Sequence, residues 1–366
     1  MKTKLVYVLT CSSDSNYIEQ ALMAVYSARH WNPEAYIILI TDNLTDQLLI
    51  GQRAAILDYI SEKIVISFDD DSVSMFYRSR ELKTTIRNII SGDYLFIDSD
   101  TITQKSLSDI DNFNSELGGV YDSHLKVSDY CESLFNHSQQ RTKLLGVDLN
   151  EEQQYFCSGV LYVKDVPSTH KLYYLWNTYW RESYSLNLFA DQPALAKANR
   201  EIGHIIQLIP DTYNCLMHVQ PIFAEEAQIL HFSSYKNPSY LFTKRVLTFI
   251  KTNGIDNEWI KESILNPCTT YLPFDYLILH SNIKQRRSWI NGLTKSFSGY
   301  RLYIDPSFED FPMNSRLRGV VVRKLQKGHI RSGIIWWMLW KRLHLLIKHK
   351  SVSDNTCKKK QQGIYG

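Results

Sequence analysis

The chain has 366 residues, of which 44% are hydrophobic and 22% are charged. This length and balance predict a folded protein of one large domain or two modest domains, and they argue against a disordered chain. The net charge is only +3, but from residue 311 to the end 13 lysines and arginines face a single acid, Asp354. The basic character therefore belongs to the C-terminal segment.

The six cysteines are widely spaced and form no CxxC pair. This spacing argues against a disulfide-rich secreted protein and favours a reducing cytoplasm. The apolar run that ends at Thr10 passes at once into the polar stretch Cys11–Asp14, so it is too short for a signal peptide with a cleavage site. We therefore expect a cytoplasmic protein.

The first hundred residues alternate strand and helix patterns, which predicts βαβ units and a largely parallel sheet. The expected strands and helices, in chain order, are Lys4–Thr10, Asn16–His30, Ala35–Thr41, Asp46–Ser61, Lys63–Phe68, Ser79–Ile90 and Asp93–Ile97. The last of these strands runs directly into Asp98, Ser99 and Asp100. These residues are therefore expected at the carboxyl end of a strand, where open α/β sheets bind their ligands.

The rest of the chain continues the α/β pattern and then becomes helical. The expected elements are a strand at Gln154–Val163, helices at Ser168–Glu182 and Asp191–Asn199, and a strand at Gln228–Phe232. From Pro238 the pattern is helical to about Ser296. We expect an α/β domain over residues 1–240, a helical extension over 241–310 and a separate basic segment over 311–366.

Asp98 and Asp100 are two apart in an extended segment, so their carboxylates point to the same side. Oxygen ligands suit Mg²⁺ or Mn²⁺, and either ion would bridge to phosphate oxygens. The apolar run Tyr94–Ile97 leaves the two acids at the mouth of the strand, where they repel each other unless a cation joins them. The alternative is a strand-ending turn with solvated carboxylates.

Positive charge lies just upstream of these acids. Arg80 and Lys83 are three residues apart on one face of the expected helix, where they could meet phosphate or sugar hydroxyls. The alternative is a solvated helix face, which is the usual role of surface charge.

Two further polar residues follow the late apolar run. The imidazole of His231 could complete the coordination shell of a cation, which favours Mn²⁺ over Mg²⁺, and the ammonium of Lys236 could neutralise a phosphate. The alternative for His231 is a structural histidine.

Asp122, Asp191 and Gln192 are candidates for orienting or deprotonating an acceptor hydroxyl. Such groups are needed where a metal and cations stabilise a leaving diphosphate. The alternatives are that Asp122 is a turn residue and that Asp191 is a helix N-cap ahead of Gln192 and Pro193.

The basic C-terminal segment contains an apolar aromatic run, Gly333–Trp340, with basic residues on both sides. Lys341 and Arg342 interrupt the run, so it is too short to span a bilayer. Tryptophans among basic residues predict a helix that lies on an anionic membrane surface. The alternative is a C-terminal helix that packs its tryptophan face on the α/β domain, and a nucleic-acid partner is not expected because no recognised module accompanies the charge.

Taken together, these motifs resemble the glycosyltransferases of family 8, which have the GT-A fold. The resemblance covers residues 1 to about 240, in fragments that follow the family's order. The matching segments are Asp14–Tyr17, Ser79–Thr84, Asp98–Asp100, Asp122 after Gly118 and Gly119, Phe156–Gly159, Asp191 with Gln192, and His231 with Lys236. Cys157 departs from the pattern, because asparagine is usual there. The Gly-Pro usual between the metal histidine and its lysine is replaced by Ser233–Tyr235, and the spacing to Lys236 is one residue shorter.

The resemblance implies a Rossmann-like mixed sheet flanked by helices and a site for a nucleotide sugar. Asp98, Asp100 and His231 would bind Mn²⁺ or Mg²⁺. The residues that would bind the UDP-sugar donor are Asp14, Asn16, Tyr17, Arg80, Lys83, Ser99 and Lys236. Catalytic roles would fall to Asp122, Asp191 and Gln192, close to the transferred sugar.

The implied reaction moves a hexose from a UDP-sugar to the hydroxyl of a glycan or lipid-linked acceptor, with retention at the anomeric carbon. Relatives of this kind serve bacterial lipopolysaccharide or polysaccharide synthesis at the inner face of the plasma membrane. Two alternatives stay open from the sequence: an inverting GT-A transferase with Asp122 or Asp191 as base, and a non-catalytic, membrane-associated protein that binds sugar nucleotides. A nucleotidyltransferase is disfavoured because Cys11–Ser13 replaces the expected glycine-rich phosphate loop.

Overall fold

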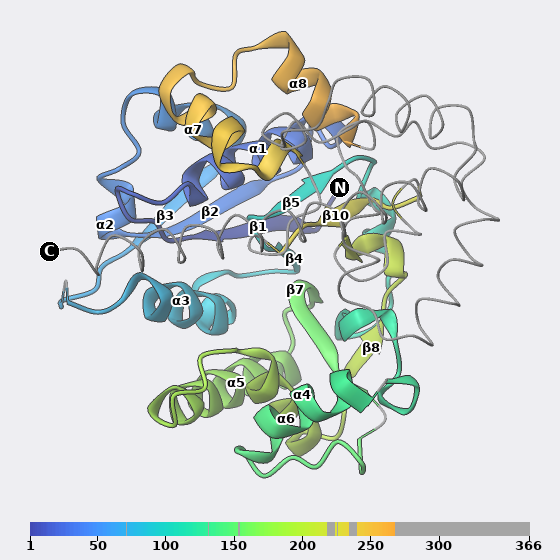
Figure 1. The fold of residues 1–366 in the computed structure, drawn as a ribbon. Helices are drawn as coiled ribbons and strands as arrows, with labels where there is room; N and C mark the ends of the chain where they lie inside the picture. The colour runs from blue at the N-terminus through green and yellow to red at the C-terminus, as the bar shows by residue number, and fades with distance from the viewer. Residues whose placement is uncertain are drawn as a thin grey trace, which may run out of the picture. The chain divides into compact units, whose positions relative to one another are not determined.

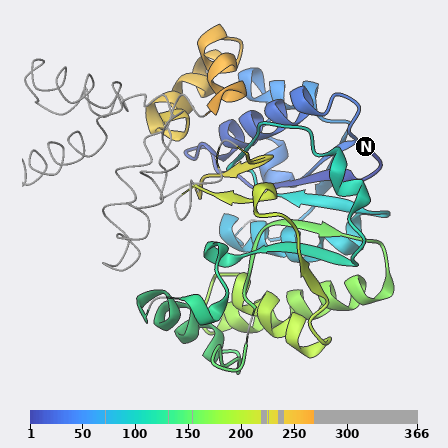
Figure 2. The same cartoon turned by 90° about the vertical axis from the view of Figure 1, so that its right-hand side faces the viewer.

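The computed structural model describes residues 1–267 except for 71, 131, 153, 218–223, 225 and 234–239. The described chain is a mixed α/β fold with a central sheet and helices on both of its faces (Figures 1 and 2). The central sheet has the strand order β3-β2-β1-β4-β7-β6-β8. Its strands are β1 Lys4–Leu9, β2 Ile37–Asp42, β3 Glu62–Ile66, β4 Tyr94–Ile97, β6 Leu117–Tyr121, β7 Phe156–Val163 and β8 Ile206–Leu208.

The direction of the strands decides where polar residues gather. β1 to β4 run parallel to one another, and β7 runs antiparallel to both of its neighbours, β4 and β6. The amino end of β7 therefore meets the carboxyl ends of β1 and β4 at one edge of the sheet. A small second sheet in the order β5-β10-β9 continues from this edge; its strands are β5 Thr101–Thr103, β9 Cys215–Leu216 and β10 Ile229–His231.

Alternate residues of the central strands feed two separate cores, as the period of two in a strand requires. Leu5, Tyr7 and Leu9 of β1 belong to the core beneath α1 Tyr17–Trp31, α7 Lys244–Asn253 and α8 Glu258–Leu265. Val6 and Val8 belong to the core beneath α3 Met75–Ile89, α5 Pro167–Ser185 and α6 Gln192–Glu201. Figure 1 shows these two helix groups on opposite faces of the sheet.

The second core is rich in large aromatic rings. Trp176 and Trp180 of α5 are fully buried. Replacing either one with alanine would lower the free energy of unfolding by about 3–5 kcal/mol. The indole Nε1 of Trp176 donates to the carbonyl of Asp191 at 2.9 Å. The packing of α5 thus fixes the residue at which α6 begins.

Most of the predicted elements form within a few residues of their expected bounds, but the helix predicted over Asp46–Ser61 is wrong. The chain instead forms a short helix, α2 Asn43–Asp46, capped by the carboxylate of Asp42, and a 3-10 helix, η1 Gly51–Tyr59. Gly51, the first residue of η1, has a φ of 56°, a left-handed conformation that a continuous α-helix across this segment does not allow.

Several elements carry no clear sequence pattern and were not predicted. They are β5, β6, β8, β9 and a helix, α4 Glu132–Lys143. β6 was not predicted because two successive glycines, Gly118 and Gly119, resemble a turn in sequence. A Cβ atom at Gly118 would lie 2.6 Å from Cγ2 of Ile209, so the glycine permits close packing inside the strand.

The structure describes only part of the expected C-terminal organisation. Helices α7 and α8 pack into the same core as α1, while the remainder of the expected extension and the basic segment 311–366 lie outside the described residues. Among the described residues, no helix is long and apolar enough to cross a membrane.

Candidate metal centre

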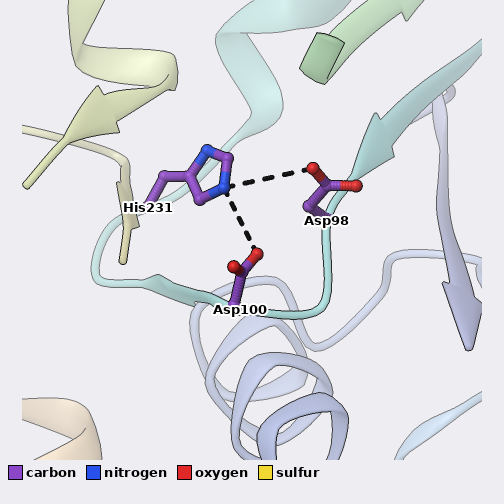
Figure 3. A group of neighbouring side chains, drawn as sticks. All are labelled: Asp98, Asp100 and His231. Atoms are coloured by element: carbon purple, nitrogen blue, oxygen red, sulfur yellow. Dashed lines mark ion pairs between the residues drawn. The ribbon is translucent and has the colours of Figure 1, made fainter. Parts of the chain in front are cut away.

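Beyond the carboxyl end of β4, the side chains of Asp98 and Asp100 meet that of His231, which is distant in sequence (Figure 3). Asp98 and Asp100 lie in the link between β4 and β5, and His231 ends β10, opposite Thr101 in the small sheet. His231 Nε2 lies 3.2 Å from Asp100 Oδ1 and 4.0 Å from Asp98 Oδ2. One ligand atom from each residue falls within 4.8 Å of the others, which is a suitable arrangement for one cation.

The donor set and its support suit a divalent ion such as Mn²⁺. Two carboxylates and one imidazole combine oxygen ligands with a nitrogen ligand, which Mn²⁺ accepts more readily than Mg²⁺ does. His231 Nδ1 lies 2.9 Å from the amide oxygen of Asn214, so Nδ1 donates there and Nε2 faces the carboxylates. Burial lowers the pKa of His231, but the contacts with Asp100 and Cys157 together raise it by more, so the net pKa lies well above its ordinary value. In the protein alone, an imidazolium therefore offsets the two acids.

Gly159 leaves the space in which these ligands pack. A Cβ atom at this position would lie 2.8 Å from His231 Nδ1 and 3.0 Å from Asp98 Oδ2. The carbonyl of Gly159 also accepts from the backbone N–H of Asp98 at 2.8 Å. The amino end of β7 thus sets both the position of Asp98 and the room for His231.

A buried ammonium group lies next to the candidate metal ligands. Lys83 is 2% exposed, and its Nζ contacts Asp98 Oδ1 at 3.2 Å, Asp191 Oδ2 at 3.1 Å and Ser158 Oγ at 3.2 Å. Burial lowers the pKa of Lys83, but Asp191 and Asp98 raise it by more, so the lysine remains charged. The interpretation of Lys83 as part of a solvated helix face is therefore wrong.

Asp191 supplies the compensating charge from the start of α6. Its side chain makes no helix-capping hydrogen bond and instead faces Lys83 and Arg80, whose Nε lies 3.5 Å from Oδ1. Burial would raise the pKa of Asp191, but Lys83 and Arg80 lower it to about 2. Asp191 thus occupies the N-cap position of α6, as the alternative expected, but its ionised carboxylate faces the candidate metal centre instead of capping the helix.

Asp122 and Gln192 form a second polar pair near Asp191. Gln192 Nε2 donates to Asp122 Oδ1 at 3.1 Å, which joins the end of β6 to the start of α6. The backbone N–H of Asp122 donates to the carbonyl of Tyr155 at 2.8 Å. The structure therefore brings Asp122, Asp191 and Gln192 to the same sheet edge.

The predicted nucleoside residues lie at the same edge of the sheet, after the carboxyl end of β1. Asp14 is exposed, whereas Asn16 and Tyr17 are half-buried at the start of α1. Their loop is held on both sides: Arg53 Nη2 donates to the carbonyl of Ser15 at 2.8 Å, and Lys251 Nζ donates to that of Ser13 at 2.6 Å.

Two predicted donor ligands remain. Ser99 is half-buried between the carboxylates of the two candidate ligands, whereas Lys236 lies outside the described residues. Sequence reasoning missed Asn214, which orients His231. Asn214 stands in an irregular stretch with no motif around it, so only the fold reveals its role.

Comparison with known proteins gives structural neighbours only. No protein-family model matches the chain, and no curated protein sequence matches it. Among solved structures, the galactosyltransferase LgtC, crystallised with donor and acceptor sugar analogs, is 13% identical with a TM-score of 0.46, covering 71% of this chain and 96% of its own.

Two further solved structures that resemble this chain are the bifunctional glycosyltransferase WbbM and the glycosyltransferase GlyE of Streptococcus pneumoniae TIGR4. WbbM is 13% identical with a TM-score of 0.45, and the match covers 72% of this chain and 51% of WbbM. GlyE is 17% identical with a TM-score of 0.44, and the match covers 73% of this chain and 63% of GlyE. All three neighbours are named as glycosyltransferases.

We predict that Gly159→Ala weakens Mn²⁺ binding by about 10–100-fold, because the added methyl displaces two ligand side chains. Titration of Mn²⁺ by calorimetry or electron paramagnetic resonance would measure the loss. Gly119→Ala is the matched control, because its Cβ would meet Leu161 and Phe156 at 3.2 Å and 3.3 Å, away from the ligands. Equal Mn²⁺ affinity in the Gly159→Ala variant and the wild type would contradict the described packing.

We predict that Asp191→Asn lowers the free energy of unfolding at pH 7 by about 3–5 kcal/mol, because the buried ammonium of Lys83 loses a partner. The pKa of Asp191 is about 2 in the folded protein, below the ordinary 3.8, so its contribution is complete above about pH 4 and disappears as pH falls through 2. Urea unfolding across this range would measure the difference. Asp256→Asn, which breaks an exposed ion pair with Lys261, should leave the urea concentration at the midpoint of unfolding nearly unchanged.

Proposed function

We propose that the protein is a metal-dependent glycosyltransferase that moves a hexose from a UDP-sugar to an acceptor hydroxyl, with retention at the anomeric carbon. One observation carries the proposal: Asp98, Asp100 and His231 converge at the carboxyl edge of the sheet, beside the buried Lys83–Asp191 pair. This edge of the sheet thus offers residues that could hold a cation, with a buried ion pair next to them.

In this proposal Asp98, Asp100 and His231 hold Mn²⁺ or Mg²⁺. When bound, the cation would neutralise the donor diphosphate and act as a Lewis acid toward the departing UDP. Lys83 contacts the proposed ligand Asp98 and Arg80 contacts Asp191, and both would present positive charge to phosphate or sugar oxygens.

The sugar would be held on the side of Asp191. This carboxylate is ionised and fixed, so it can stabilise positive charge that develops at the anomeric carbon without prior reorganisation. Gln192 and Asp122, joined by their hydrogen bond, would orient the sugar or the acceptor hydroxyl. We assign no covalent nucleophile.

The remaining donor contacts follow the family resemblance. Asp14, Asn16 and Tyr17 would bind the nucleoside, and Ser99 and Lys236 would contribute to the diphosphate site. Lys251 and Arg53 would act indirectly, since they hold the backbone of the nucleoside loop.

The place of action is proposed from the basic segment 311–366. Its aromatic run would lie in the interface of an anionic membrane, and the acceptor would be a glycan or a lipid-linked saccharide. The enzyme would then be peripheral, at the inner face of a bacterial plasma membrane, and serve lipopolysaccharide or polysaccharide synthesis.

We predict that the protein hydrolyses or transfers from a UDP-hexose only with Mn²⁺ or Mg²⁺, and that Asp98→Asn and Asp100→Asn each lower turnover by about 100-fold or more. A panel of UDP- and GDP-hexoses, assayed with and without Mn²⁺, would measure this. Asp109→Asn removes an exposed carboxylate of the 3-10 helix Ser108–Asn112 and should retain activity. Full turnover in both site variants would sink the proposal, and nuclear magnetic resonance of the released sugar would distinguish retention from inversion.

We predict that the full chain sediments with vesicles containing anionic lipid, and that replacing Trp336, Trp337 and Trp340 with serine reduces the bound fraction severalfold. The reason is that tryptophan rings anchor a helix at the headgroup level while basic residues attract anionic lipid. Vesicle co-sedimentation at low and high salt would measure the two contributions. Identical partitioning of the two proteins would refute the membrane role of this run.

A further inference from the structure

The turn that carries Asp122 has an unfavourable backbone. It follows β6 as a 3-10 turn, η3 Asp122–His124, in which Ser123 and His124 have φ values of 59° and 54°. Two successive residues other than glycine in the left-handed region are uncommon, and each costs on the order of 1–3 kcal/mol. Such a turn persists only where its surroundings hold it in place.

The side chain of His124 supplies that restraint. It is fully buried, and both of its ring nitrogens are engaged. Leu216 donates its backbone N–H to Nε2 at 3.0 Å, so the ring proton is on Nδ1, which donates to Asp211 Oδ1 at 2.9 Å. Because Nε2 is occupied by an N–H donor, His124 cannot accept a proton from a substrate while this contact lasts.

The partners of His124 belong to the segment that also orients the metal histidine. Leu216 of β9 is paired with His231 of β10 in register, and Met217 donates its backbone N–H to the carbonyl of His231 at 2.9 Å. Asn214, two residues before Leu216, accepts from His231 Nδ1. His124 therefore connects the turn of Asp122 to the segment 211–217 beside the metal centre.

We propose that His124, with Asp211, is a positioning residue that fixes Asp122 relative to the metal ligands. This inference rests on the proposed function, because Asp122 and Gln192 are assigned there to the sugar or acceptor. The His124–Asp211 pair holds the strained turn, and the turn sets the direction of the Asp122 side chain. The carboxylate of Asp122 then accepts the hydrogen bond from Gln192 Nε2. Without the pair, the turn relaxes and Asp122 moves while the metal ligands keep their own supports.

Steady-state kinetics with the UDP-hexose of highest turnover test the inference. We expect His124→Ala and Asp211→Ala to lower kcat by about 10–100-fold, since misplacement of a catalytic group by about 1 Å has effects of this size. KM for the donor and the affinity for Mn²⁺ should change less than about threefold, because the donor diphosphate and the cation are held elsewhere. The double variant should lose no more than either single one.

Two matched variants separate positioning from a general loss of stability. Asp211→Asn retains an oxygen that accepts from His124 Nδ1 and should retain most of kcat, unlike Asp211→Ala. His170→Ala removes an exposed histidine that makes a similar 2.8 Å contact with Asp165, beyond the far end of β7, and should leave the kinetics unchanged.

A crystal structure of His124→Ala with Mn²⁺ gives a readout that does not depend on turnover. We expect the hydrogen bond between Gln192 and Asp122 to be lost while Asp98, Asp100 and His231 stay in place. An unmoved turn, or an unchanged kcat in a folded His124→Ala protein, would overturn the inference. A wild type inactive with every donor would refute the proposed function instead, and the crystal structure would still decide the role of His124.

Discussion

The polar edge of this fold depends on one buried cation, the ammonium of Lys83. A charged lysine at 2% exposure is tolerable only with partners close by, and its partners come from three different elements: Asp98 after β4, Ser158 in β7 and Asp191 before α6. Satisfying the lysine therefore brings these elements together. The same contacts place one candidate metal ligand and one candidate sugar-facing carboxylate, so the requirements of folding and of the proposed chemistry coincide here.

The candidate metal ligands also depend on strand register. His231 lies opposite Thr101 in the antiparallel pair β5–β10, and Thr101 directly follows Asp100. A shift of one residue would turn the imidazole to the other face of the small sheet. Gly159 adds a steric requirement, because any side chain there would occupy the space of His231. Register and the missing Cβ together fix a geometry that the three ligand residues could not fix alone.

Sequence patterns were informative where one periodic signal dominates. The buried strands β1, β2 and β4 alternate between two cores, so their existence and the strand-end position of Asp98 follow from the apolar pattern. The pattern failed over Asp46–Ser61, where the cap at Asp42 and the left-handed Gly51 override helical spacing. It also gave no sign of His124, Asn214 or Asp211. Their roles arise from contacts across 17 to 92 residues of sequence, which no local signal encodes.

The unfavourable features of this fold gather around the candidate site. Buried Lys83 and Asp191, the neighbouring carboxylates of Asp98 and Asp100, and the strained turn at Ser123 and His124 each oppose stability when taken alone. The two apolar cores on either side of the sheet provide the free energy that offsets them. Each of these features is held by partners from other elements, so the fold sets the positions of the charges at this edge. Charges placed in advance need little reorganisation when charge develops on a bound substrate, and this is the physical reason to place the proposed chemistry at this edge.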